Sequence, residues 1–421
     1  MGQNSVEELV SLEQVQRVVL GSCSPLGPIE VELAAALGFV LAEDLRAPRD
    51  LPPFDNTAMD GYALRAKDTV DAPVELSVIG VLPAGVAPVQ VVEPGTAVRI
   101  MTGAPIPAGA DGIVIVERTA PGSSEGKVRI LEKASPGDYI RSAGSDLRRG
   151  DLALAAGTVI GPAHISLLAS IDATRVSVHA RPKVGVLSTG DELVGGSAPL
   201  ELGQIRDSNR QGLLASLQRD DLVGVDLGVR RDNEEEILAA IREGVEHCDA
   251  LLTTGGVSMG EFDFVKVALE RLVAEHGGQA HQFKVAIKPA KPLSFAAVPT
   301  TGGRVVPVFG LPGNPVSSMV SYQVIALPVL RRLAGHRSPL PHRLAAVAAD
   351  ELERRPDGKL HLVRVVAAMG PDGRVVVRSA GGQGSHQIAA LAAANALALV
   401  PDGTGVTTGG EVQILLTGSL E

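Results

Sequence analysis

"KVGVLSTGDEL" occupies residues 183–193 and sets the architecture of the central part of the chain. Its first half is a short apolar run rich in valine, which is typical of a buried strand. Comparable runs recur at 222–229, 250–256 and 305–313, and segments with helical features separate them. Strands that alternate with helices predict a largely parallel sheet with helices on both faces. We therefore expect an open α/β domain over residues 181–336.

Four helices are expected between or after these strands. They begin near Asp207, Asn233, Glu261 and Asn314, and the third has the least regular pattern. Asparagine is a preferred N-cap residue, and a proline directly after Asn314 suits the first position of a helix. These capping residues thus indicate where the helices of the central part begin.

The regions on either side differ in texture from this domain. Residues 49–141 alternate short Val/Ile runs with Gly/Pro turns, which predicts an inserted β-rich domain. In 337–421 three Asp-Gly turns separate β-rich runs, and we expect a small β-barrel-like domain without helices. Segments 1–48 and 142–180 are assigned to a discontinuous linker or dimerisation domain. The fold class is therefore multi-domain α/β plus β.

Three helices are expected in that discontinuous domain. The first lies within 5–22, where apolar residues recur at helical spacing and Ser5 with Glu8 forms a capping box. The others are expected at 29–38 and 161–171.

Composition indicates a globular protein and limits its partners. A chain of 421 residues with 38 basic and 48 acidic side chains has a net charge of −10, which argues against wholesale nucleic-acid binding. The absence of Trp argues against stacking platforms for single strands. No apolar run approaches the roughly 20 residues that span a bilayer, and the N-terminus does not resemble a signal peptide. The two cysteines match no zinc or disulfide spacing, so we expect a cytoplasmic protein without membrane partners.

Three loops follow strands of the expected sheet, at the edge where open α/β folds bind ligands. They are "LSTGDEL" (187–193), "TTGGVSMGEFDF" (253–264) and "GLPGNPVSS" (310–318). The last two open helices, whose free N–H groups and positive ends suit a phosphate. A single loop of this kind is as often a plain tight turn, but three at one edge favour a site. The candidate ligand-binding residues in them are Gly255, Gly256, Ser258, Gly260, Pro312, Gly313, Asn314 and Ser317.

A cationic segment, "FKVAIKPAKP" (283–292), is the expected counterpart of these loops. Lys284, Lys288 and Lys291 have helical spacing, but the prolines at 289 and 292 forbid a helix. We expect an extended loop instead. Surface lysines are usually just solvated. In an acidic protein, and beside two loops suited to phosphate, these lysines instead predict a binding site for a polyanion.

Carboxylates in loops are the second group of candidates. For Asp207 and Asp232 helix capping is the favoured interpretation. Asp263 differs, because a bare carboxylate beside a phosphate seat would repel the ligand, and a bridging Mg²⁺ would resolve the conflict. The nine histidines are scattered, which argues against a transition-metal site. The candidates are Asp60, Asp146, Asp191, Glu192, Asp207, Asp232 and Asp263.

Eight sequence blocks together resemble the molybdopterin molybdenumtransferase family, which includes the E domain of gephyrin and its plant relatives. The resemblance runs in order from about residue 7 to the end. One departure is Ala290, where the family usually has glycine, and alanine tolerates a positive φ poorly. The blocks are "PPFDNTAMDGYA", "RIMTGAPIPAGAD", "STGDEL", "QIRDSNR", "TTGGVSMGEFDFVK", "KVAIKPAKPLSF", "GLPGNPVSS" and "GGQGSHQIAALAAANAL".

The resemblance implies an enzyme of molybdenum cofactor biosynthesis. Its substrates would be molybdate and adenylylated molybdopterin, and it would insert the metal at the dithiolene sulfurs and release AMP with the help of Mg²⁺. It would act as an elongated homodimer with the site in a cleft, partly completed by the partner subunit. The upstream adenylyltransferase and downstream molybdoenzyme chaperones are the implied protein partners.

The resemblance also assigns roles to residues. Asp60, Glu192, Asp263 and Thr102 would be catalytic, and Asp191, Glu192 and Asp263 would hold the metal. Lys284, Lys288, Lys291 and Ser385 would bind the cofactor together with the loop residues named above. Asp146 and Asp232 match less certain acidic positions of the family. Turn formation is the alternative role for Asp60.

Three other interpretations remain open. A molybdopterin adenylyltransferase would share the central domain only, and the blocks at 51–65, 98–117 and 381–397 weigh against it. A non-catalytic scaffold of the gephyrin type would want a further domain or a long linker. A paralogue specific for tungsten or another pterin would keep the same phosphate and lysine sites.

Overall fold

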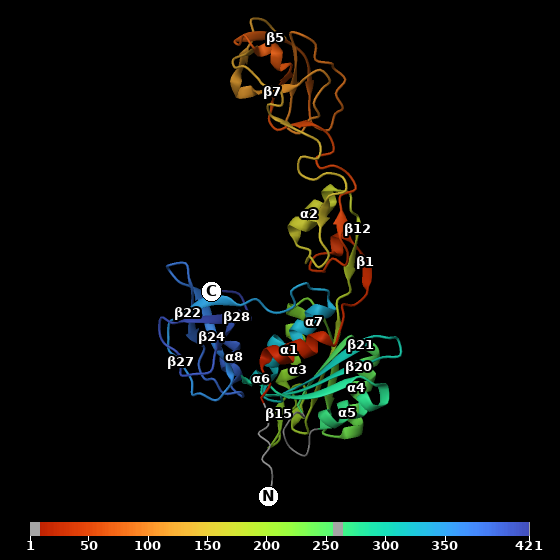
Figure 1. Ribbon diagram of the computed structural model, residues 1–421, viewed down its shortest axis with the longest axis vertical. Helices are drawn as coiled ribbons and strands as arrows, with labels where there is room; N and C mark the ends of the chain where they lie inside the picture. The colour runs from red at the N-terminus through yellow and green to blue at the C-terminus, as the bar shows by residue number, and fades with distance from the viewer. Residues whose placement is uncertain (1–8, 256–263, 421) are drawn as a thin grey trace. The chain divides into compact units, whose positions relative to one another are not determined.

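The computed structural model describes residues 9–255 and 264–420, and the chain divides into two compact units. The first comprises Met1–Ile29, Gly38–Ala42 and Val178–Glu421, and the second comprises Glu30–Leu37 and Glu43–Ser177. Both contain sheets together with helices, as expected from the sequence (Figure 1). Two units are a coarser division than the four expected domains, which stay a proposal.

A six-stranded mixed sheet forms the centre of the first unit. Its strand order is β16-β13-β17-β21-β20-β18, and the first four of these strands run parallel. They correspond to the four strands expected from the sequence, while the antiparallel pair at the other edge was not expected. The strands are β13 (Lys183–Thr189), β16 (Val223–Arg230), β17 (Ala250–Thr254), β18 (Gln279–Lys284), β20 (Pro292–Pro299) and β21 (Val305–Leu311).

Helices cover both faces of this sheet because side chains of the strands alternate between two cores. Leu252 packs into the core under α1, α3, α6 and α7, whereas its neighbour Leu251 packs into the core under α4 and α5. Figure 1 shows these helices around the sheet. Their bounds are α1 (Leu12–Gly21), α3 (Ser208–Arg219), α4 (Glu234–His247), α5 (Phe264–His276), α6 (Pro315–Ser321), the π-helical η4 (Tyr322–Ala326) and α7 (Leu327–Leu333).

Helix α1 begins later than the sequence pattern indicated. The proposed capping pair, Ser5 and Glu8, lies outside the described residues. The described helix is capped by a different box, in which Ser11 Oγ accepts from the Gln14 N–H and the Gln14 side chain accepts from the Ser11 N–H. Leu12, Val15 and Val19 are buried, and burying such side chains contributes about 1.5–3 kcal/mol each.

The C-terminal part of the first unit is a second six-stranded sheet. Five of its strands lie side by side in the order β24-β25-β22-β28-β26. An additional pairing between β24 and β26 closes these five strands into a ring. The sixth strand, β19 (Ile287–Lys288), comes from the lysine segment and pairs in parallel with β24. The expectation that no helix follows Arg337 was wrong, since α8 (Ile388–Ala392) forms in an alanine-rich stretch. The remaining elements are β14 (Leu193–Val194), β15 (Ile205–Arg206), β22 (Leu344–Ala348), β23 (Leu352–Glu353), β24 (Leu360–Met369), β25 (Val375–Ser379), β26 (Ala396–Val400), β27 (Gly405–Val406) and β28 (Glu411–Leu416).

The second unit contains a six-stranded sheet of order β7-β4-β6-β5-β9-β8 with two small cores. The expected helix over 29–38 was wrong: the chain forms β1 (Pro28–Glu32) and a short 3-10 turn, because Ile29 and Val31 alternate with glutamates at the period of a strand. The other elements are η1 (Leu33–Ala35), β2 (Leu45–Arg46), β3 (Asn56–Thr57), β4 (Gly61–Leu64), η2 (Ala66–Thr69), β5 (Val74–Leu82), β6 (Thr96–Ile100), β7 (Gly112–Ile115), η3 (Val116–Arg118), β8 (Thr119–Pro121), β9 (Lys127–Ile130), β10 (Ile140–Arg141), β11 (Leu152–Leu154), α2 (Pro162–Ser170) and β12 (Arg175–His179).

Candidate functional site

A pocket of about 1170 Å³ lies in the first unit, at the carboxyl ends of β13, β17 and β21. This is the edge at which an open α/β sheet binds its ligand. The lysine segment and the loop that precedes α8 complete the wall. Ligand pockets commonly enclose about 300–1,000 Å³, so this one has room for a ligand of nucleotide size or larger.

A glycine at the end of β17 allows this strand end to approach the end of β13 closely. Gly255 has a φ of 98°, and a Cβ atom there would lie 2.1 Å from the Thr189 carbonyl oxygen. Only glycine fits such a position. A Cβ atom on Gly313 would stand 3.6 Å from the Gly255 Cα, so the ends of β17 and β21 meet at these two residues. Gly255 therefore has a structural role as well as a place in the pocket wall.

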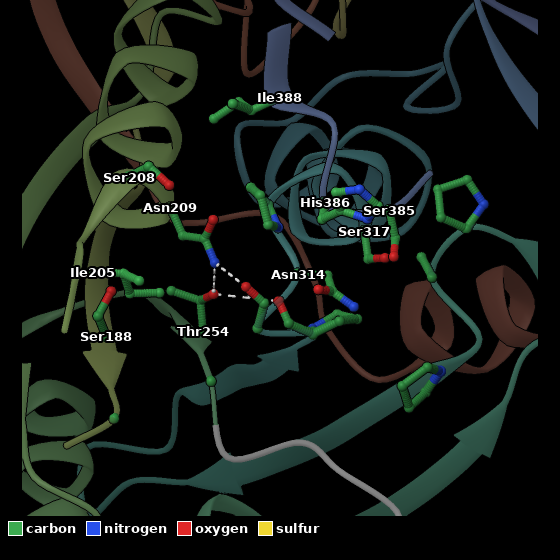
Figure 2. Close-up of a pocket in the computed structure, with 18 of the residues that line it drawn as sticks. Ser188, Ile205, Ser208, Asn209, Thr254, Asn314, Ser317, Ser385, His386 and Ile388 are labelled. Atoms are coloured by element: carbon green, nitrogen blue, oxygen red, sulfur yellow. Dashed lines mark hydrogen bonds between the residues drawn. The ribbon is translucent and has the colours of Figure 1, made fainter. Parts of the chain in front are cut away.

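The pocket brings together residues predicted from all three loops and from the C-terminal block. Figure 2 shows Asn314 and Ser317 of the β21–α6 junction beside Ser385. The Val316 N–H, at the start of α6, donates to the Ser385 carbonyl at 3.1 Å. This N–H group is therefore not available to a ligand. Asn314 is the N-cap residue, as expected, although its side chain makes no capping hydrogen bond. The predicted residues that line the pocket are Glu192, Gly255, Lys288, Lys291, Pro312, Gly313, Asn314, Ser317 and Ser385.

The cationic side of the pocket combines expected and unexpected residues. Lys288 and Lys291 line it, while Lys284 ends β18 and is not part of the wall. Sequence analysis missed Lys359 and Arg206, which also line the pocket. The Lys359 Nζ lies 3.1 Å from a carboxylate oxygen of Asp357, which holds this ammonium group in place. The pocket edge therefore carries four positive side chains suited to an anionic ligand.

Carboxylates form an opposing group. Glu192 and Asp232 line the pocket, and the Asp191 carboxylate accepts a hydrogen bond from the Asp232 N–H at 3.3 Å. Removal from water, followed by the charges of Asp191 and Glu192, raises the pKa of Asp232. The expected capping role of Asp232 was wrong, because the side chain of the next residue, Asn233, caps α4. Asp207 does cap its helix, as predicted.

Of the three expected metal ligands, Asp191 and Glu192 belong to the described residues and Asp263 does not. The expected ligand-binding residues Gly256, Ser258 and Gly260 also lie outside the described part of the chain. Among residues 9–255 and 264–420, no three His, Cys, Asp or Glu side chains are grouped so that they could hold a metal ion. Asp191 and Glu192 therefore could only contribute part of a coordination shell.

Asp60, Thr102 and Asp146 belong to the second unit. One oxygen of the Asp60 carboxylate accepts from the N–H and from the hydroxyl of Thr102, each at 2.7 Å. The backbone bond first, and then the hydroxyl bond, lower the pKa of Asp60. The carboxylate thus stays ionised and bonds to a distant strand end, which a simple turn former would not do.

Several polar residues of the wall were not recognised in the sequence. They come from the ends of β13 and β17, from β15 and the start of α3, and from the C-terminal part of the first unit. Within "QIRDSNR", only the aspartate was assigned a role of its own. The missed residues are Ser188, Thr189, Arg206, Ser208, Asn209, Thr254, Lys359, Gln383 and His386.

A pocket with cations at its rim, set at the ligand-binding edge of an α/β sheet, is suited to a large anionic metabolite. Three family models cover most of the chain. "MoeA N-terminal region (domain I and II)" matches residues 10–171, "Probable molybdopterin binding domain" matches 185–332, and "MoeA C-terminal region (domain IV)" matches 345–417.

Curated relatives and solved structures agree with these models. A molybdopterin molybdenumtransferase of Haemophilus influenzae is 37% identical over 90% of this chain and 91% of its own. Molybdopterin molybdenumtransferase 2 of Mycobacterium tuberculosis is 38% identical over 96% and 98%. The molybdopterin biosynthesis moeA protein of Pyrococcus horikoshii superposes with a TM-score of 0.80 at 28% identity, over 97% of this chain and all of that one. The chain belongs to the molybdopterin molybdenumtransferase family.

Among the described residues, none of the helices is both long and apolar enough to cross a membrane.

Proposed function

We propose that the chain is a molybdopterin molybdenumtransferase that inserts molybdate into adenylylated molybdopterin and releases AMP. The observation that supports this best is the pocket of about 1170 Å³, whose rim carries Lys288, Lys291, Lys359 and Arg206. Both proposed substrates are anions, one through its phosphates and the other as an oxyanion. Charge-assisted hydrogen bonds from ammonium and guanidinium groups are the strong contacts that such ligands need.

Each wall of the pocket would bind a different part of the substrate. Lys288 and Lys291 would hold the pyrophosphate linkage, because they project from the segment between β18 and β20 onto the pocket. The hydroxyls of Ser317 and Ser385, which lie together in Figure 2, would donate to oxyanion oxygens. Hydroxyl and ammonium donors suit molybdate oxygens, and no soft protein ligand is required because the dithiolene sulfurs come from the pterin.

Mg²⁺ fits this pocket as an ion carried mainly by the substrate. Mg²⁺ commonly binds through one or two carboxylates together with phosphates and water. Glu192 with Asp191, and Asp263 outside the described residues, would supply those carboxylates. Burial first, and then the charges of Asp191 and Glu192, raise the pKa of Asp232, and a bound cation would reduce the second effect. When bound, the ion would polarise the phosphoryl group of the anhydride.

Asp60 and Thr102 complete the proposal as catalytic residues of the second unit. The ionised Asp60 would orient a water or a cation near the reacting phosphate, with the hydrogen bonds from Thr102 fixing its carboxylate. We further propose a cytoplasmic homodimer that receives its substrate from the upstream adenylyltransferase and passes the product to molybdoenzyme chaperones.

The proposal is tested by following both products of one reaction. Purified protein is incubated with adenylylated molybdopterin, molybdate and Mg²⁺, and released AMP and pterin-bound molybdenum are measured together. Equal yields of the two, lost on exhaustive chelation of divalent cations, are expected. AMP release without molybdenum on the pterin would contradict the transfer, and full activity after chelation would remove Mg²⁺ from the proposal.

A further inference from the structure

The amide of Asn209 has a fixed orientation in the pocket wall. Its Nδ2 donates to Thr254 Oγ1 and to the Gly313 carbonyl oxygen, both at 2.7 Å (Figure 2). A carbonyl oxygen can only accept, so the amide nitrogen must face Gly313 and the amide oxygen must face away from it. The two bonds therefore determine which end of the side chain is left for other partners.

The remaining end, Oδ1 of Asn209, is buried and receives no hydrogen bond from any described residue. The same holds for Oγ1 of Thr189, whose residue is 1% exposed. These two atoms flank Thr254 and Gly255, and all four residues line the pocket. Buried polar atoms without partners are uncommon in native proteins, and a ligand or a water that the protein alone does not supply is one explanation for them.

The chemistry of the unpaired atom limits what the partner can be. An amide oxygen accepts hydrogen bonds and donates none. Phosphate and molybdate oxygens are acceptors as well, so they cannot satisfy it. The anionic half of the proposed substrate therefore belongs with the lysines, and a group with an N–H or O–H donor belongs at Asn209.

We propose that Asn209 is a specificity-determining residue that accepts a hydrogen bond from an exocyclic amino group on the ring of the substrate, with the Thr189 hydroxyl beside it. This inference rests on the proposed function, because it is adenylylated molybdopterin that supplies such a group. Both of its ring systems carry one, on the pyrimidine ring of the pterin and on the adenine. The shared chemistry is an amino group on a nitrogen heterocycle.

The amino group matters because its replacement reverses the hydrogen bond. An oxo group in its place presents an acceptor to the Asn209 oxygen and leaves that buried atom unpaired. Leaving a buried polar atom without a partner lowers affinity by about 10-fold or more. The site should therefore reject oxo analogues of one of the two rings.

Two matched ligand pairs test this and separate the rings. AMP is compared with inosine monophosphate, and 6-hydroxymethylpterin with 6-hydroxymethyllumazine, by calorimetric titration of the full-length protein. We expect the amino compound to bind about 10-fold tighter in one pair, and that pair identifies the ring at Asn209. In Asn209→Ala the ratio should fall to about one.

Thr254→Val is the control variant, because it removes one partner of the Asn209 Nδ2 and leaves the Gly313 bond that orients the amide. It should retain the preference for the amino compound even where it weakens both members of a pair equally. Equal binding within both pairs by the unaltered protein would overturn the proposal and leave the Asn209 oxygen to a water. A ratio that survives in Asn209→Ala would also overturn it. Neither result affects the transfer reaction, which the coupled release of AMP tests separately.

Discussion

Ala290 holds a left-handed backbone conformation with a φ of 79° between two prolines of the lysine segment. It is only 3% exposed and belongs to the larger core of the first unit. A left-handed conformation costs an L-residue about 1–2 kcal/mol, whereas burial of a methyl group returns about 0.8 kcal/mol. Burial of the methyl group offsets part of the backbone cost and leaves a net cost of about 0.2–1.2 kcal/mol, which the folded chain tolerates.

Substitutions at this position should separate the two effects. Ala290→Gly relieves the backbone but removes the buried methyl group, so the free energy of unfolding should change by less than about 1 kcal/mol. Ala290→Val adds a β-branched side chain at a positive φ and should destabilise the protein by about 1–3 kcal/mol. Thermal and urea unfolding of both variants measure this. A valine variant as stable as the unaltered chain would show that the segment does not require the left-handed conformation.

A second prediction at the residue scale concerns the pKa of Asp60, whose carboxylate is bound by Thr102. Because the pKa of Asp60 is lowered from its ordinary value, the carboxylate is ionised throughout the neutral range. Thr102→Val removes the hydroxyl bond and keeps the backbone N–H bond, so the pKa should rise part of the way toward its ordinary value. A carbon-13 NMR titration of the carboxylate measures it. The acid limb of the activity profile should move to higher pH in the same variant.

Thr119→Val is the matched control, because the Thr119 hydroxyl donates to the Val116 carbonyl and does not touch Asp60. It should leave the titration of Asp60 as it is. An unchanged Asp60 titration in Thr102→Val would show that the hydroxyl does not stabilise the carboxylate.

At the scale of the element, the lysine segment is held at both ends by strands. Lys288 lies in β19, opposite His361 of β24, and β18 and β20 anchor the segment on either side. Because the backbone of Lys288 is already ordered, less conformational freedom is lost when it binds an anion than for a lysine on a mobile loop.

Lys288→Ala should therefore weaken binding of the adenylylated substrate. A lost charge-assisted contact to phosphate costs about 1.5–3 kcal/mol, or roughly 10- to 150-fold in affinity. Lys183→Ala is the control, since Lys183 begins β13 and so lies at the opposite edge of the sheet. Calorimetric titration distinguishes the two variants. Equal affinities would remove Lys288 from the phosphate site.

The elements that sequence analysis predicted and those it missed differ in a physical way. The parallel strands β13, β17 and β21 are short, largely buried and rich in apolar residues, so their own residues carry the signal. Strand β16, at the edge of the sheet, is not buried, but its Val/Leu/Gly pattern was still recognisable. Strand β19 has two residues and exists only because β24, some 70 residues later, pairs with it. A pairing partner so distant is not visible in a local pattern.

The same distinction holds for the site. Lys288 and the Gly-rich loops were found because their residue types stand out along the chain. Lys359 was hidden in an Asp-Gly turn, and Asn209 was hidden behind the capping aspartate of α3. The roles proposed for both residues depend on which side chains come together around the pocket, and no local pattern in the sequence shows that arrangement.

At the scale of the whole molecule, the candidate catalytic residues are divided between two units. Glu192 lines the pocket of the first unit, and Asp60 belongs to the second. We propose that in a homodimer the second unit of one subunit serves the pocket of the other. A complete site would then require both chains.

Mixing two inactive variants tests this arrangement. Asp60→Ala and Glu192→Ala should partly complement each other after subunit exchange, because a mixed dimer contains one intact site. Random mixing of equal amounts makes about half the dimers mixed, so about a quarter of full activity is the upper limit. Absence of recovery, with exchange verified by mass spectrometry, would contradict this arrangement: either both residues serve the site of one subunit, or Asp60 is only a turn former.

The transfer of molybdenum in the pocket of the first unit is tested most directly by locating the metal. Crystals of the protein are soaked with adenylylated molybdopterin and either molybdate or tungstate, and the metal is located by its anomalous scattering. We predict metal density in the pocket beside Ser317 and Ser385, with the phosphates at Lys288 and Lys291. Metal and nucleotide bound away from these residues, or nucleotide in the pocket with metal elsewhere, would contradict the proposed reaction.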